Sequence, residues 1–291
     1  MGKIDDIQAY KEWTEYHRSL KRDKAADNLS PVERKKKLEK LEANVIEWIL
    51  FFFSEFAKYP FTKFHKKAIK RITTNMEWYE VLSWSRELAK STIVFMCMMY
   101  LVLTGKKRNV LLISNSHENA VRLLEPYKKA FESNSMLKAY YGDLREFGSW
   151  TADEFTLTTG ATFRAIGALE SPRGTKKDAV RPDTALVDDF DTDPDCRNPD
   201  ILKKKWEWFE EALFPTRSIS EDLLVIFCGN LIALDCCVKR AGEKADHWDI
   251  VNIRDKEGKS SWPEKNTEER IDRIQSKIST KAFQQEYMNN P

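Results

Sequence analysis

The sequence predicts an α/β fold in which a mostly parallel sheet is flanked by helices, joined to a small helical subdomain. Three observations lead to this prediction. Apolar runs of strand length alternate with helical stretches from about residue 78 onward. The 291 residues are 42% hydrophobic, which is enough for a large buried core and excludes wholesale disorder. Glycine and proline number only 10 each, which excludes collagen-like and low-complexity chains.

Five apolar runs have the length and composition of buried strands. They are Tyr79–Trp84, Asn109–Ser114, Thr162–Gly167, Thr184–Asp188 and Leu223–Cys228. Helical stretches separate most of these runs, at residues 90–104, 117–133 and 201–213. Such alternation is typical of a parallel sheet with helices on both faces. The run at residues 155–158 is expected to form an inserted hairpin with the strand that starts at Thr162.

Both ends of the chain are expected to be helical. Ser30 followed by Pro31 is a helix start, with a capping hydroxyl and a proline in the first turn. We assign residues 1–55 to an N-terminal helical segment, 56–260 to the core and 261–291 to a C-terminal helical lid or linker.

Charge and apolar content limit the classes of partner. A net charge of +2 neither announces nor excludes a nucleic acid, because a local basic patch can exist on a neutral protein. The apolar run from Ile93 to Val102 is far shorter than the roughly 20 residues of a membrane-spanning helix, so no membrane partner is expected. Five unpatterned cysteines predict a reduced, cytoplasmic interior.

Residues 79–100 have the strand–turn–helix order of a phosphate-binding loop. In such a loop, backbone N–H groups and the helix N-terminus hold phosphate oxygens. Lys90 would reach the β- and γ-phosphates, and the Ser91 hydroxyl would bind Mg²⁺. The regular G-x-x-x-x-G-K-[ST] spacing is not met, because Trp84 and Ala89 occupy the glycine positions. An ordinary strand–helix turn with an exposed lysine is the alternative.

A second segment, TALVDDFD at residues 184–191, is an apolar strand that ends in paired carboxylates. This is a Walker B pattern, which delivers an acid to the edge where α/β sheets bind ligands. Asp188 would hold Mg²⁺, and Asp189, or failing that Asp191, would orient or deprotonate the attacking water. A calcium loop fits poorly because Pro194 stands where glycine is required, whereas a two-metal nuclease cluster stays open.

A third element is the apolar run that ends at Gly229 and Asn230. A polar side chain at the tip of the strand after Walker B is placed to sense the γ-phosphate. An ordinary turn at the end of a strand is the alternative.

These segments, in this order, resemble the ATPase half of the large terminase subunit of tailed double-stranded DNA phages. The family's deviant phosphate loop reads S-R-x-x-G-K-[ST], and SRELAKS at residues 85–91 matches it except at Ala89. The resemblance extends over roughly residues 55–291. Further similar stretches are ISNSHENAVRLL (113–124), SPRG (171–174), RPDTALVDD (181–189), KKKWEWFEEALFP (203–215), VIFCGN (225–230) and the terminal AFQQEYMNNP.

The resemblance implies a RecA-like P-loop ATPase of the ASCE class that uses ATP and Mg²⁺ to pump viral DNA into a capsid. Arg86 would stabilise phosphate charge like an arginine finger in cis, since a guanidinium is planar and permanently charged. Asn230 would couple the γ-phosphate to DNA movement. The implied phosphate-loop contacts are Ser85, Arg86, Glu87, Leu88, Ala89, Lys90, Ser91 and Thr92.

Upstream, PFTKFHKKAIKR at residues 60–71 lies where the family carries an adenine-reading segment. Phe64 would stack on the base, and His65 stands where the family often has glutamine. The alternative is a helix with Phe64 buried.

The resemblance also implies partners: double-stranded DNA, the portal protein, the small terminase subunit and further copies in a ring on the procapsid, in the host cytoplasm. The nuclease domain of the family is not expected in this chain. DNA backbone contacts are expected from basic residues. The candidates are Lys176, Lys177, Lys203, Lys204 and Lys205.

Three alternatives stay open at this point. One is a regulatory or assembly nucleotide-binding module with little turnover. Another is a different RecA-like helicase or translocase. The third is a DNA-binding scaffold without working Walker sites.

Overall fold

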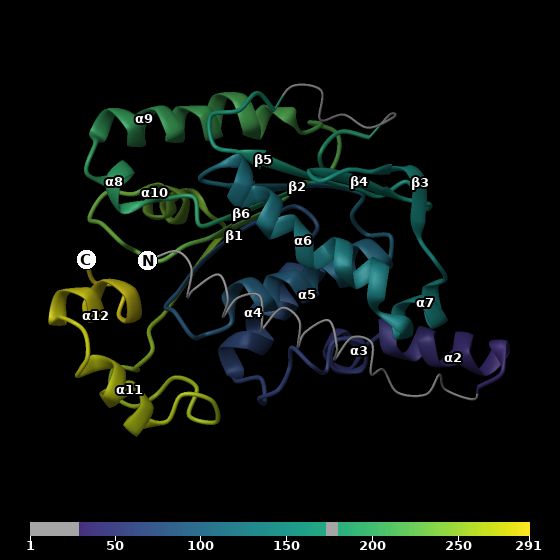
Figure 1. Ribbon diagram of the computed structural model, residues 1–291, viewed down its shortest axis with the longest axis horizontal. Helices are drawn as coiled ribbons and strands as arrows, with labels where there is room; N and C mark the ends of the chain where they lie inside the picture. The colour runs from purple at the N-terminus through teal and green to yellow at the C-terminus, as the bar shows by residue number, and fades with distance from the viewer. Residues whose placement is uncertain (1–28, 173–179) are drawn as a thin grey trace.

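The computed structural model describes residues 29–172 and 180–291. Its centre is an eight-stranded sheet in the order β3-β4-β5-β2-β6-β7-β1-β8 (Figure 1). Neighbouring strands are parallel except in the β3–β4 and β4–β5 pairs, which are antiparallel. The strands are β1 (Trp78–Trp84), β2 (Asn109–Ser114), β3 (Arg145–Trp150), β4 (Glu154–Leu157), β5 (Thr162–Gly167), β6 (Thr184–Asp188), β7 (Leu224–Cys228) and β8 (His247–Val251). The predicted mostly parallel α/β fold and its hairpin are confirmed.

The helices follow the predicted alternation with strands. The expected helix at residues 201–213 is α9, which passes into a π-helical turn at Trp208–Leu213. The helices are α2 (Pro31–Glu42), α3 (Val45–Phe52), α4 (Lys63–Thr74), α5 (Lys90–Leu103), α6 (His117–Ser133), α7 (Ser135–Tyr141), α8 (Asp193–Cys196), α9 (Pro199–Glu207), α10 (Cys237–Lys244), α11 (Glu268–Gln275) and α12 (Thr280–Tyr287).

Each central strand buries both faces, because successive side chains point to opposite sides of the sheet. Leu82 and Leu186 belong to a core cluster on one face, and Val81 and Val187 belong to a second cluster on the other. Figure 1 shows α3, α4 and α5 on the first side and α9 on the second. Two buried faces explain why the strands appear in the sequence as continuous apolar runs.

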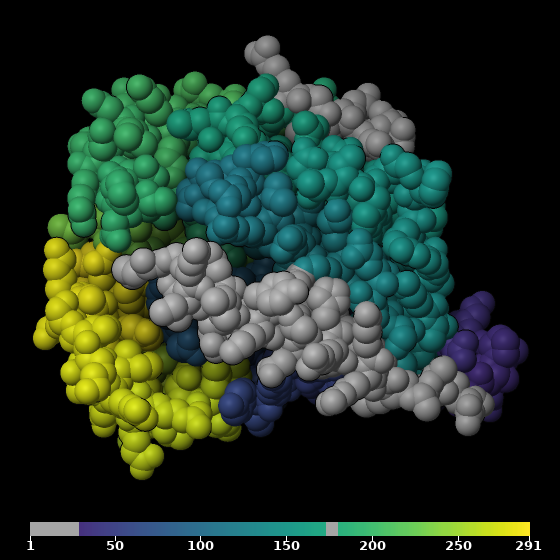
Figure 2. All heavy atoms as spheres, in the orientation of Figure 1, coloured from purple at the N-terminus to yellow at the C-terminus, as the bar shows by residue number. Residues whose placement is uncertain are grey.

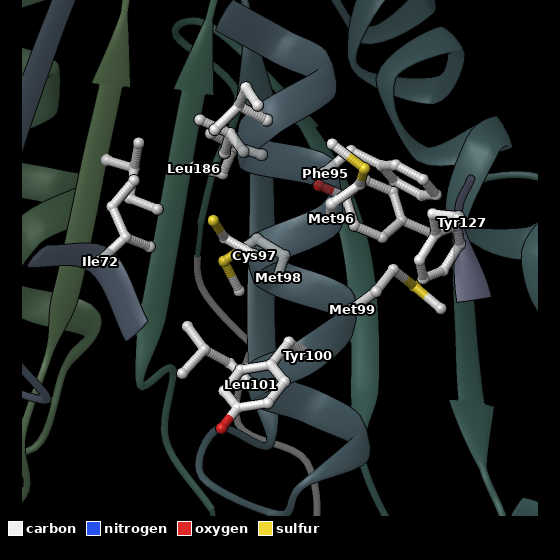
Figure 3. Packing of buried hydrophobic residues seen from close by; sticks show 14 of the residues in the cluster. Ile72, Phe95, Met96, Cys97, Met98, Met99, Tyr100, Leu101, Tyr127 and Leu186 are labelled. Atoms are coloured by element: carbon white, nitrogen blue, oxygen red, sulfur yellow. The ribbon is translucent and has the colours of Figure 1, made fainter. Parts of the chain in front are cut away.

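Helix α5 lies inside the core and is buried at every position from Ile93 to Val102. Its side chains radiate toward neighbours on all sides, and the rings of Phe95 and Tyr127 lie 5.0 Å apart (Figure 3). A helix that is apolar all round is stable only when surrounded in this way. The N-terminus of α5 is therefore held in a fixed place at the carboxyl edge of the sheet.

The segments at the two ends of the described chain pack on the same core. Ser30 caps α2, as the sequence predicts, and it forms a capping box with Glu33. Leu41 and Trp48 from α2 and α3 share a cluster with Ile271 and Phe283 from α11 and α12. The boundaries at residues 55/56 and 260/261 stay predictions, and residues 1–28 of the expected N-terminal helical segment lie outside the described part.

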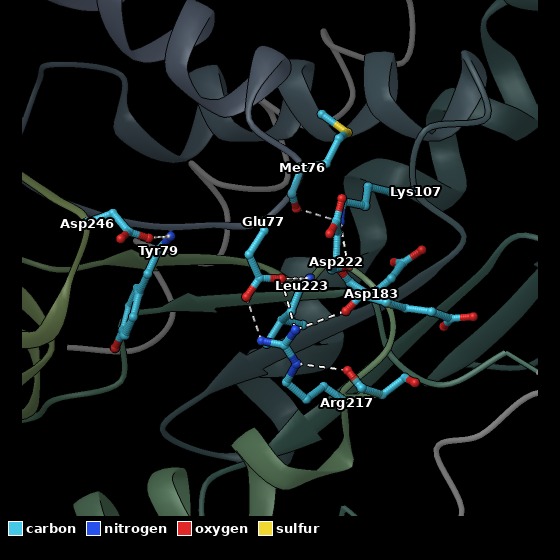
Figure 4. A network of polar contacts seen from close by, with 11 residues as sticks. Met76, Glu77, Tyr79, Lys107, Asp183, Arg217, Asp222, Leu223 and Asp246 are labelled. Carbon is cyan, nitrogen blue, oxygen red and sulfur yellow. Dashed lines mark hydrogen bonds and ion pairs between the residues drawn. The ribbon is translucent and has the colours of Figure 1, made fainter.

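The amino ends of the central strands are tied together at the edge opposite to the site. The buried Lys107 Nζ donates hydrogen bonds to the carbonyls of Met76, Asp183 and Asp222, at 2.9, 3.0 and 3.0 Å (Figure 4). These residues shortly precede β1, β6 and β7. All three donors of the ammonium are thus satisfied, and Lys107 connects the starts of β1, β6 and β7.

Candidate nucleotide-binding site

A cleft of about 880 Å³ lies at the carboxyl edge of the sheet. Strand β7 lies between β6 and β1, so the loops after three adjacent strands converge there, where open α/β sheets bind ligands. Residues 252–291, called here the C-terminal segment, form another wall. The lining includes Ser85, Arg86, Glu87, Ala89, Lys90, Ser91, Thr92, Asp189, Asp191, Gly229, Asn230, Trp262, Lys265 and Glu286.

The loop between β1 and α5 bends without glycine. Glu87 and Ala89 have φ values of 70° and 57°, in the left-handed region that side chains with a Cβ seldom adopt. Lys265 Nζ and Asn266 Nδ2 both donate to the Glu87 carbonyl, at 2.8 and 3.1 Å. Contacts from the C-terminal segment therefore support a bend that glycine provides in regular phosphate loops, and α5 begins at Lys90 beside the cleft.

Ser91 and Asp188 meet directly. The Ser91 hydroxyl donates to Asp188 Oδ2 at 2.6 Å, which joins the start of α5 to the end of β6. Burial raises the pKa of Asp188 to about 6, opposed by the charge of Lys90 and reinforced by that of Asp189. A hydroxyl and a carboxylate in contact are oxygen donors of the kind that Mg²⁺ prefers, and a cation would offset the cost of burying this charge.

Lys90 also contacts the tip of β7. Its Nζ donates to Asn230 Oδ1 at 3.2 Å, and Asn230 Nδ2 donates to the Glu286 carbonyl at 3.1 Å. One amide therefore connects the start of α5 to α12. The expected convergence of Lys90, Ser91, Asp188 and Asn230 is present in the geometry.

The two candidate water-activating acids have different surroundings. Asp191 accepts hydrogen bonds from the backbone N–H groups of Cys237 and Val238 at 3.0 and 2.9 Å, so it caps the N-terminus of α10. Asp189 is exposed toward the cleft with φ 47°, and its carboxylate makes no hydrogen bond within the described residues. The Asp189 carboxylate is therefore available to a ligand in the cleft, whereas the Asp191 carboxylate is already bound to the start of α10.

Arg86 is held by Glu286, a residue that no pattern in the sequence indicates. Its Nε forms an ion pair with the Glu286 carboxylate, and its backbone N–H donates to the Glu286 carbonyl at 3.2 Å. Figure 2 shows the C-terminal segment, in yellow, lying against the green residues of the α8–α10 region. Gln285 Nε2 donates to Asp193 Oδ1 at 2.9 Å, so α12 bridges two walls of the cleft. No local pattern announces such contacts, because the partners are 200 and 92 residues apart.

No protein-family model matches the chain, and no curated protein matches its sequence. The crystal structure of the HK97 bacteriophage large terminase matches with a TM-score of 0.52 at 13% identity, over 79% of this chain and 50% of that chain. The chain has the RecA-like fold of a large terminase. It spans about half the length of that protein.

Two structures of the large terminase ATPase domain from Thermus phage P74-26 are each 16% identical to this chain. Their TM-scores are 0.47 and 0.48, over 82% of this chain and 97% and 96% of theirs. In the described ranges of this terminase-like fold, the helices are all too short or too polar to cross a bilayer.

Phe64 and His65 do not line the cleft of this terminase-like fold. His65 is buried, with Nδ1 2.9 Å from Thr62 Oγ1 and Nε2 3.0 Å from the Leu88 carbonyl. Desolvation lowers the pKa of its imidazole to about 4. The Phe64 ring packs against Trp84 at 4.9 Å. The expected adenine contact by these two residues is corrected accordingly, since both ring nitrogens of His65 already have partners.

Leu88 also departs from the expected set of contacts. Its side chain is fully buried in the core and does not line the cleft, although its neighbours do. Only its carbonyl takes part, as the partner of His65. Leu88 therefore anchors the loop between β1 and α5 to the core.

The lysines expected to contact DNA differ in how exposed they are in this fold. Lys205 is buried, and its Nζ donates to the Phe190 carbonyl and to Asp195 Oδ2. It supports the segment after β6 and is not available to DNA. Lys203 is exposed on α9, and its Nζ lies 3.6 Å from Glu207 Oε1. Lys204 on the same helix is also exposed. Lys176 and Lys177 lie outside the described residues.

Proposed function

We propose that this chain is the ATP-hydrolysing motor domain of a phage large terminase, which moves double-stranded DNA into a procapsid. The observation that carries the proposal is the meeting of Lys90, Ser91, Asp188 and Asn230 at one cleft. These residues come from three separate segments, and each has the chemistry that phosphoryl transfer requires at its position. The terminase fold supports the choice of motor among RecA-like ATPases.

Triphosphate binding falls to the loop before α5. Lys90 is a point charge for the β- and γ-phosphates, and the N-terminus of α5 offers free N–H groups to their oxygens. Ser91 and Asp188 would hold Mg²⁺, which neutralises charge that develops on the phosphates during transfer. The direct hydrogen bond from Ser91 to Asp188 already brings both proposed metal ligands to one place.

Asp189 positions the attacking water and accepts its proton, since its carboxylate is exposed in the cleft next to the metal-binding acid. Arg86 lines the same cleft and stabilises the transferred phosphoryl group once it leaves Glu286. The adenine base of the nucleotide would stack on aromatic side chains that line the same cleft. They are Phe56, Tyr59 and Trp262. These side chains take the place of Phe64 and His65.

Asn230 passes the state of the γ-phosphate to α12, because its amide contacts both Lys90 and the Glu286 carbonyl. Movement of α12 against the core then transmits hydrolysis to the parts that grip DNA. The portal protein, the small terminase subunit and a ring of copies on the procapsid, in the host cytoplasm, complete the machine that this proposal assigns.

Steady-state ATP hydrolysis, measured with and without double-stranded DNA, tests the proposal. Lys90→Ala should abolish turnover, while Lys256→Ala, which changes an exposed lysine outside the cleft, should leave turnover at the level of the parent. Turnover that survives Lys90→Ala would refute the assignment of the phosphate site.

A regulatory nucleotide-binding module with little turnover is the second candidate. It is favoured by the engagement of Arg86 with Glu286 and by the Cβ of Ala89 in a left-handed bend. Tight nucleotide binding together with no DNA-stimulated hydrolysis would identify this module in place of a motor.

A further inference from the structure

We propose that the exposed face of α4 is a docking surface for the phosphate backbone of double-stranded DNA. This inference rests on the proposed function for the identity of its partner and adds the place of contact. Helix α4 has the sequence KFHKKAIKRITT, with four lysines, one arginine and no acidic residue. The whole chain has a net charge of only +2, so this single helix carries more net positive charge than the chain as a whole.

The two faces of α4 have opposite character. Ala68, Ile69 and Ile72 are buried in the core, together with His65. The four lysines are exposed, and their side chains make no hydrogen bond or ion pair with any described residue. They are Lys63, Lys66, Lys67 and Lys70. Arg71 is different, because Glu80 and Asp249 neutralise its guanidinium. The lysines therefore form the free charge of this helix.

Their spacing suits a regular polyanion. Positions i, i+3, i+4 and i+7 lie on one stripe of a helix, here roughly 10 Å long. Duplex DNA carries a phosphate charge about every 1.7 Å along its axis, so a stripe of this length faces several phosphates whatever the base sequence. Contacts of this kind position a duplex without reading bases, as a packaging motor requires.

Lysine chemistry favours DNA over an acidic protein as the occupant. Protein interfaces are enriched in aromatic residues and arginine at their centres, and lysine is depleted there. The exposed positions of α4 offer lysines and Thr74 but no exposed aromatic anchor. Helix α2 also has exposed lysines, but Glu33 and Glu39 are exposed among them, which weakens its attraction for a polyanion.

The buried face of α4 connects this surface to the phosphate loop. His65 contacts the Leu88 carbonyl at 3.0 Å, one residue before the left-handed Ala89 and two before Lys90. His65 therefore links the helix that carries the lysines directly to the phosphate loop. DNA held on α4 and nucleotide held by Lys90 would act on opposite ends of the same short path.

Fluorescence anisotropy with a labelled duplex of random sequence, without nucleotide and over a series of salt concentrations, tests the surface. The variant Lys63→Gln/Lys66→Gln/Lys67→Gln/Lys70→Gln is compared with Lys256→Gln/Lys259→Gln/Lys277→Gln/Lys281→Gln. The control removes the same charge from exposed positions on the C-terminal segment. Thermal unfolding checks that both variants are folded.

A plot of log affinity against log salt concentration has a negative slope. We expect the α4 variant to make this slope shallower by about 3 to 4, because each lost phosphate contact removes about 0.9 from its magnitude. The control should change the slope by less than about 1. Equal slopes for the two variants would overturn the proposal, and so would unchanged DNA binding by an α4 variant that had lost binding to an acidic polypeptide.

The two proposals fail in different ways. ATP turnover that survives Lys90→Ala refutes the phosphate site and leaves the DNA measurement unaffected, since that measurement uses no nucleotide. Conversely, an unchanged salt slope refutes the α4 surface even when the parent hydrolyses ATP. The four lysines lie outside the cleft, so basal ATP turnover of the α4 variant should equal that of the parent.

Discussion

The hydroxyl of Ser91 donates a hydrogen bond of 2.6 Å to Asp188 Oδ2, although the two residues are 97 positions apart. The contact joins the first turn of α5 to the last residue of β6, which are the proposed phosphate loop and the proposed Walker B acid. Because the strands are parallel, both carboxyl ends reach the same edge of the sheet. The candidate metal site therefore follows from strand topology.

Ser91→Ala removes one of the two donors proposed for Mg²⁺. We expect ATP turnover to fall at least about tenfold and the Mg²⁺ concentration for half-maximal activity to rise. A Mg²⁺ titration of ATP hydrolysis measures both effects. Ser276→Ala, at an exposed serine outside the cleft, is the matched control. Equal Mg²⁺ dependence in both variants would contradict a role for Ser91 in metal binding.

Replacement of the two neighbouring acids separates their roles. Asp189→Asn should reduce turnover about 100-fold or more, because it removes the group proposed to accept the proton of water. Asp191→Asn should instead lower the free energy of unfolding by about 1 kcal/mol and change turnover little, because asparagine keeps only one acceptor oxygen for the two N–H groups at the start of α10. Kinetics and denaturant unfolding of both variants check this pair. The opposite pattern would move the catalytic role to Asp191.

Glu286→Gln should strengthen nucleotide binding. The Glu286 carboxylate competes with phosphate for Arg86, whose side chain is 65% exposed, so the ion pair is weak. We expect the affinity for an ATP analogue to rise about two- to fivefold, the equivalent of an exposed ion pair of about 0.5–1 kcal/mol. Isothermal titration calorimetry measures the change, with Glu269→Gln as the exposed control. Weaker binding by Glu286→Gln would show that the pair supports the site.

His65 makes stability depend on pH. Its pKa is lowered in the folded chain to about 4 from an ordinary 6.5, so the unfolded chain binds the proton first as pH falls. Stability is therefore complete above about pH 6.5 and declines toward about pH 4. When the pH falls from 7.5 to 5, protonation of His65 in the unfolded chain should lower the free energy of unfolding by about 2 kcal/mol.

His65→Gln keeps an amide that can reach the Leu88 carbonyl but does not titrate. Denaturant unfolding of the parent and this variant at both pH values isolates the contribution of His65 from that of other groups. The variant should lose less stability on acidification than the parent. An identical loss in the two proteins would mean that His65 is protonated equally well in the folded and unfolded states.

The buried strands were predictable because burial on both faces leaves a continuous apolar run. The expected Tyr79–Trp84 differs from β1 by one residue, and Asn109–Ser114 coincides with β2. The edge strands β3 and β8 were missed. REFGSW and HWDIV are largely exposed or half-buried, so they mix polar and apolar residues and lack the signal of a core strand.

The site was predictable where its chemistry is local and unpredictable where it depends on tertiary contacts. SRELAKS and LVDD specify residue types at fixed spacing, which is why Lys90 and Asp188 could be proposed as site residues from the sequence. Glu286, Lys265 and Asn266 reach the loop from the other end of the chain, and no local pattern announces them. In α4 the spacing of Ala68, Ile69 and Ile72 marks the inward face, but His65 is polar, so its burial among them was not predictable.

The position of a non-hydrolysable ATP analogue and Mg²⁺ in a crystal structure of the complex decides whether this cleft binds nucleotide. We expect three phosphates along residues 85–92, with the β- and γ-phosphates near Lys90 Nζ and the metal bound by Ser91 Oγ and Asp188. A nucleotide bound away from this loop, or no bound nucleotide at saturating concentration, would contradict this expectation.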